Sequence, residues 1–133
     1  MALANQEQVE ALADNITKCA DSIHDRLKKA IKNKEIDQYT AQTIFQDEAT
    51  MRQHADSLYI DAANCVVEDL AESQKSVMTL IDTAKETIKT IENIARFIDL
   101  IADLLVLAAA AYAAKPAPIL AALKEVKDDV DAL

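Results

Sequence analysis

The chain of 133 residues contains no glycine, whereas average usage of about 7% would give about nine. Glycine enters the left-handed backbone region at little steric cost, so a chain without it is poorly suited to tight β-hairpin turns. The glycine-rich loops that hold nucleotide phosphates are excluded as well. Hydrophobic residues make up 51% of the chain, and alanine and other good helix formers are abundant. The sequence therefore predicts an all-α protein, and its length suits a single domain, 1–133.

Apolar side chains recur at steps of three and four along most of the chain, as in amphipathic helices. Asn5 and Gln8 form a capping box at the start of the first helix, and Asp37 is a suitable N-cap for the second. Asn33 suits the left-handed position that ends the first helix. We predict an antiparallel helical bundle of three long helices plus a short C-terminal helix, at about 5–33, 38–71, 75–114 and 118–131.

The connection between the second and third predicted helices has two interpretations. Residues 71–76 contain no large apolar side chain, but neither glycine nor proline marks a turn there. The chain either turns at this point or continues as one rod of about 75 residues, roughly 110 Å long. We favour the turn, because globular helices rarely exceed about 25 residues unless they form coiled coils.

The predicted helix 75–114 has the most regular pattern. Its apolar positions from Val77 to Ala109 alternate steps of four and three without a miss, and its charged residues lie on the opposite side. Such a seam is typical of a helix in a bundle or coiled coil.

The segment 104–123 most requires an explanation. From Leu104 to Ala114 the chain carries no charge, and a helix that is apolar on all sides has to be buried by protein or by lipid. This run extends about 16 Å, too little to span a hydrocarbon core of about 30 Å. The last helix, a second chain or a membrane could each cover it. The candidate interaction residues are Leu104, Leu105, Leu107, Tyr112, Ile119, Leu120 and Leu123.

The chain is acidic, with 23 Asp and Glu against 14 Lys and Arg and a net charge of −9. A nucleic-acid backbone is repelled by such a surface. The basic residues between Arg26 and Lys34 fall at the end of the first predicted helix, where cations complement the helix dipole. We therefore expect no nucleic-acid partner.

The two cysteines, Cys19 and Cys65, occupy apolar positions of the predicted helices. We expect both thiols to be buried, free and not bonded to each other. The first residues show no basic segment followed by an apolar one, so no secretory signal is visible. The expected location is the cytoplasm.

The titratable residues suggest no catalytic or metal site. Asp21 and His24 lie three positions apart, but a carboxylate-bridged metal bundle needs such a pair on two helices and further glutamates. His54 and Ser57 share a helix face, but mid-helix amides cannot form an oxyanion hole because they are already bonded. We expect no enzyme, no cofactor and no metal site.

These observations favour a non-enzymatic, acidic helical-bundle protein that acts by interaction, as a homo-oligomer or with a helical protein partner. The alternative is a membrane-active helical protein of the pore-forming toxin type, which would use the apolar segment 97–123. A third possibility is a bundle that binds a small ligand between its helices.

Overall fold

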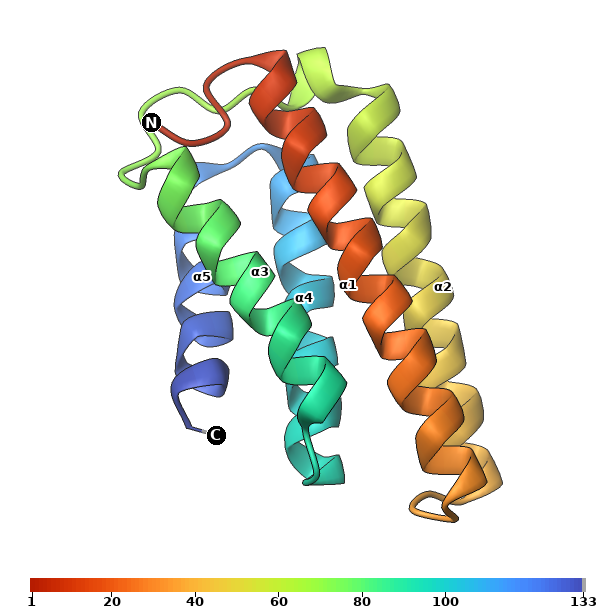
Figure 1. Ribbon diagram of the computed structural model, residues 1–133. Helices are drawn as coiled ribbons and strands as arrows, with labels where there is room; N and C mark the ends of the chain where they lie inside the picture. The colour runs from red at the N-terminus through yellow and green to blue at the C-terminus, as the bar shows by residue number, and fades with distance from the viewer. Residues whose placement is uncertain (133) are drawn as a thin grey trace.

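The computed structural model describes residues 1–132, and Figure 1 shows a protein built of helices and their connections. The elements are α1 (Gln6–Lys32), α2 (Gln38–Ile60), the 3₁₀ helix η1 (Ala62–Cys65), α3 (Gln74–Thr90), α4 (Ile94–Ala113) and α5 (Pro116–Asp131). No β-strand occurs within residues 1–132, so the all-helical prediction is confirmed. Successive α-helices run in opposite directions in Figure 1.

The first helix, α1, begins where the sequence predicts and ends slightly differently. Asn5 Oδ1 accepts a hydrogen bond from the backbone N–H of Gln8 at 2.9 Å, and Gln8 Oε1 accepts one from Ala4 N–H at 2.8 Å. Both bonds satisfy amides that have no partner inside the helix. At the other end Asn33 has φ −89°, and the left-handed residue is Lys34, with φ 58°. The prediction that Asn33 takes this position was therefore wrong.

The second helix, α2, starts at its predicted cap but is shorter than predicted. Asp37 Oδ1 accepts a hydrogen bond from Thr40 N–H at 2.7 Å, as expected of an N-cap. The helix ends at Ile60, so the predicted range 38–71 was wrong at its C-terminal end. η1 and an irregular connection follow, up to the N-cap Ser73 of α3. The chain therefore turns between α2 and α3, and the long rod is excluded.

The N-terminal residues hold this connection in place. Ala2 N–H donates to the carbonyl of Glu72 at 2.7 Å, and Val67 N–H donates to the carbonyl of Leu3 at 2.8 Å. Leu3 N–H donates to the side chain of Gln74 at 3.1 Å. Ala2, Leu3 and Val67 are all buried. The regular spacing of apolar residues between α2 and α3 therefore comes from a buried segment that is not helical.

The predicted helix 75–114 consists of two helices, α3 and α4, which is a correction to the sequence interpretation. The chain leaves α3 at Ile91, whose ψ of 128° is extended, and Asn93 caps α4 by accepting a hydrogen bond from Arg96 N–H at 3.1 Å. Ile91 is buried, but the predicted apolar seam leaves the core after it, because Ile98, Ala102 and Ala109 are exposed. Phe97, Leu100 and Leu104 are buried instead, so this part of the seam prediction was wrong. The expected layout of three long helices and one short helix is accordingly not confirmed.

The five α-helices form a closed ring around one core. α1 packs against α2 and α3, α5 packs against α3 and α4, and α4 packs against α2. The last helix starts near its predicted position, with Pro116 in its first turn, where a missing amide donor costs nothing. The largest buried side chains include Phe97, Leu12, Ile16, Ile23, Met51, Leu58, Ile81 and Leu100.

Candidate interaction surface

The predicted interaction residues divide into three groups. Leu104, Leu107, Ile119 and Leu123 are buried. Leu105 and Leu120 are half-buried, and Tyr112 is exposed. The chain therefore covers one side of its apolar segment itself, because α5 folds back against α4.

The opposite side of α4 remains exposed and has an unusual composition. We call it the α4 outer face, and it consists of Ile98, Ala102, Leu105, Val106, Ala109, Tyr112 and Ala113. Val106, near the middle, is 56% exposed. From Ala102 to Ala113 the face carries no charge, over about three helical turns or roughly 16 Å, and Asp99 borders it at the N-terminal end.

At one end of the α4 outer face, Tyr112 joins α4 to the end of α2. Its hydroxyl donates to Asp61 Oδ2 at 2.8 Å, and this carboxylate raises the pKa of Tyr112. Cys65 Sγ donates to the carbonyl of Tyr112 at 3.6 Å. Ile60, directly before Asp61, is 79% exposed.

At the seam between α4 and α5, two carboxyl groups meet. Burial, followed by a hydrogen bond with Asp129, raises the pKa of Asp103 to about 7. The negative charges of Asp129, Glu125 and Asp99 act in the same direction. Asp129 Oδ2 is buried, and no amide, hydroxyl or cationic group of residues 1–132 donates a hydrogen bond to it. A proton on Asp103 supplies a donor for this pair, so the seam is best satisfied when Asp103 is neutral.

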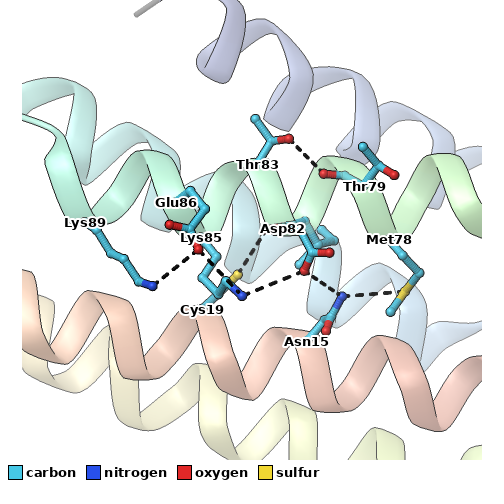
Figure 2. Close-up of polar contacts among 10 residues, drawn as sticks. Asn15, Cys19, Met78, Thr79, Asp82, Thr83, Lys85, Glu86 and Lys89 are labelled. Carbon is cyan, nitrogen blue, oxygen red and sulfur yellow. Dashed lines mark hydrogen bonds and ion pairs between the residues drawn. The ribbon is translucent and has the colours of Figure 1, made fainter.

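Polar contacts between α1 and α3 surround the first cysteine, as Figure 2 shows. Asn15 Nδ2 donates to Asp82 Oδ1 at 3.3 Å, and Cys19 Sγ donates to the carbonyl of Ile81 at 3.7 Å. Burial raises the pKa of Cys19 to about 12, which makes it a poor nucleophile. Burial also raises the pKa of Cys65. Both thiols are free and buried, so the prediction for the cysteines is confirmed.

The histidine that the sequence singled out belongs to a polar network between α1 and α2. His24 Nδ1 lies 2.8 Å from Glu48 Oε1, and Arg52 Nε donates to Glu48 Oε2 at 3.0 Å. Arg52 also donates to Asp21 at 2.7 Å. Glu48 is buried, although its charge suggested a surface position. The spacing of Glu48 and Arg52, four residues apart on a helix, was the available signal.

A second buried charge, Arg26, was interpreted only as part of a basic cluster. Its Nε donates to the carbonyl of Ile91 at 2.8 Å, and its two terminal nitrogens donate to Glu35 at 3.1 and 3.0 Å. Its guanidinium lies 5.7 Å from the ring centroid of Phe97. Arg26 thus joins α1, the α1–α2 turn and the α3–α4 break. Its place in the apolar rhythm, three residues after Ile23, indicated that it points inward.

The remaining titratable residues that the sequence singled out lie apart from these networks. Within residues 1–132, no group of three or more His, Cys, Asp and Glu side chains is placed to hold a metal ion. His54 and Ser57 are both half-buried on α2. No family model, curated protein or solved structure matches the chain. Over the same residues, no helix has both the length and the apolar character needed to cross a membrane.

Proposed function

We propose that this chain is a non-enzymatic interaction protein whose copies associate through the α4 outer face. The observation that carries the proposal is the absence of charge on this face in a protein with a net charge of −9. Two acidic copies repel each other over most of their surface, and self-association favours a face that brings no carboxylates together. Free, buried thiols support a cytoplasmic location.

The pattern of side-chain sizes on the α4 outer face favours a two-fold, antiparallel pair of α4 helices. If the axis passes between Leu105 and Val106, those two residues lie opposite each other. Ile98 then lies opposite Ala113, and Ala102 opposite Ala109. Ile98 thus faces a small side chain, and the small pair Ala102 and Ala109 allows the helices to approach closely. The same surface serves both copies, as a two-fold interface requires.

The mass of the protein in solution tests this proposal. We expect light scattering at micromolar concentration to give a mass near twice the 14.6 kDa of the chain. Val106→Lys should return it to the monomer mass without unfolding it, because Val106 is exposed in a single copy. Phe45→Lys is the matched control, since Phe45 is 55% exposed and lies on α2, away from the face. It should leave the mass unchanged.

Other results would replace the proposal. A monomer mass for the unmodified chain at all concentrations would exclude self-association. If Val106→Lys left the mass unchanged but removed binding to phospholipid vesicles, the membrane-active alternative, which uses segment 97–123, would be favoured instead. If Val106→Lys abolished capture of a helical protein and not self-association, the face would serve a different chain.

A further inference from the structure

A groove separate from the α4 outer face lies between α3 and α5. We call it the α3–α5 groove, and its volume is about 630 Å³. Apolar side chains from both helices line it: Val77, Leu80, Leu120, Leu123 and Val130. Leu80, Leu120 and Val130 are only half-buried, so the groove presents apolar surface to solvent. Two of these residues, Leu120 and Leu123, belong to the apolar segment that the sequence singled out.

The rim of the groove is polar and carries more positive than negative charge. Lys75, Lys124 and Lys127 line it, against the carboxylates of Glu72 and Asp131. Lys127 is engaged by Asp131, whose Oδ2 lies 3.0 Å from its Nζ. Within residues 1–132, Lys75 and Lys124 have no ion-pair partner. A local excess of positive charge in an acidic chain favours an anionic group.

Hydroxyl groups on α3 add to the polar rim. Ser76, Thr79 and Thr83 all line the groove. Figure 2 shows Thr79 and Thr83 on the side of α3 opposite Asn15 and Cys19, that is, away from α1. Thr83 donates its hydroxyl hydrogen to the carbonyl of Thr79 at 2.9 Å. The α3 surface that faces the groove is therefore distinct from the surface that packs on α1.

The size of the groove distinguishes between a helix and a small molecule. A helix with its side chains is about 10–12 Å wide and rises 1.5 Å per residue, so each residue occupies roughly 120–170 Å³. The groove would hold only about four or five such residues, little more than one turn. Sites for small molecules have volumes of about 300–1,000 Å³, a range that includes this groove.

We propose that the α3–α5 groove binds a single-chain amphiphile with an anionic head group. The alkyl chain lies along Leu80, Leu120 and Val130, and the head group lies between Lys75 and Lys124. A carboxylate and a phosphate share the chemistry that these lysines recognise. The proposal is independent of self-association, because none of these residues belongs to the α4 outer face.

Isothermal titration calorimetry with decanoate and with decyl phosphate, both below their micelle-forming concentrations, tests the proposal. We expect saturable one-to-one binding of at least one of them and at least tenfold weaker binding of the uncharged decanol. Tighter binding of decyl phosphate supports the same site and assigns the head group to phosphate. Tighter binding of decanoate supports it and assigns a carboxylate.

Two charge-reversal variants separate the groove from a general effect of net charge. Lys124→Glu should weaken binding about tenfold or more, because it places a like charge beside the head group. Lys28→Glu makes the same change of charge on the exposed surface of α1 and should leave binding unchanged. Circular dichroism shows that both variants are folded. Absence of binding to the unmodified chain, equal binding of decanol, or equal weakening by both variants would each overturn the proposal.

Discussion

At the scale of single residues, the chain has no glycine, and four other residues within 1–132 take the left-handed backbone conformation. Leu3, Lys34, Asp69 and Ala114 have φ between 55° and 59°. An L-residue with a Cβ atom in this region costs roughly 1–2 kcal/mol. Ala114 is the clearest case, because it ends α4 and has no polar side chain to compensate.

We predict that Ala114→Gly stabilises the protein. Relief of the left-handed strain outweighs the added entropy of glycine in the unfolded chain, so the free energy of unfolding should rise by about 0.5–1 kcal/mol. Urea unfolding followed by circular dichroism measures it. The matched control is Ala121→Gly, in the exposed interior of α5, which should destabilise by about 1 kcal/mol. Equal losses in both variants would contradict the prediction.

Residue-scale features were predictable from the sequence where their causes are local. The caps Asn5 and Asp37 depend on amides three residues away, and both were predicted correctly. The residue in left-handed conformation after α1 was not, because it depends on where the chain goes next. Glu35 N–H bonds to the carbonyl of Ala30 at 2.9 Å, which places Lys34 in the turn. The side chain of Glu35 is held by Arg26 from inside the protein.

At the scale of helices, the break between α3 and α4 is the feature that the sequence concealed. The spacing of apolar residues in the sequence runs through it, although Ile91 lies in extended backbone and the side of the chain that is buried changes after it. Asparagine is a preferred N-cap residue, but Asn93 lies between apolar residues at regular helical spacing, so it was predicted to lie within one helix. The carbonyl of Ile91 finds its donor in Arg26, on another helix. Periodicity along one segment contains no information about such a partner.

We predict that Arg26 contributes strongly to the stability of this break. Arg26→Ala leaves the carbonyl of Ile91 without its donor and removes packing against Phe97, so it should cost about 3 kcal/mol. The stability of Arg26→Lys should lie between those of the unmodified chain and Arg26→Ala, since one ammonium cannot reproduce the paired bonds to Glu35. Arg96→Ala, at an exposed position on α4, is the control. Chemical denaturation measures the free energy of unfolding of each variant. If Arg26→Ala lowered it no more than Arg96→Ala does, this role of Arg26 would be refuted.

The helix scale also explains why the candidate surface was only partly predictable. Segment 104–123 is apolar on nearly every side of its helices, so the sequence could not indicate which side faces the core. Leu104 and Leu107 turned out to be buried, whereas Val106 between them is exposed and was not among the predicted residues. The buried side of α4 is the side against which α5 and α2 pack.

At the scale of the whole molecule, the ring of five helices closes where α5 meets α4. The composition of the sequence predicted that the chain is helical. Which helices become neighbours depends on contacts between residues that are far apart in the sequence. The seam that completes the ring contains Asp103 and Asp129, with Asp99 and Glu125 close by. All four groups are acidic, so ionisation of Asp103 adds a negative charge to a site that already repels it.

The stability of the whole protein should therefore depend on the protonation of Asp103. Its pKa is raised from 3.8 to about 7 in the folded chain, so between about pH 4 and pH 7 the folded state holds a proton that the unfolded state has released. The contribution of this group is fully present below about pH 4 and is lost as the pH rises through about 7.

We predict that Asp103→Asn, whose amide keeps a donor for Asp129, reduces the loss of stability between pH 5 and pH 8. Urea unfolding at both pH values gives the comparison. The exposed acid Asp56 on α2 provides the matched control, and Asp56→Asn should retain the pH dependence of the unmodified chain. If both variants kept the pH dependence of the unmodified chain, Asp103 would not hold a proton at this seam, and the buried oxygen of Asp129 would need another donor.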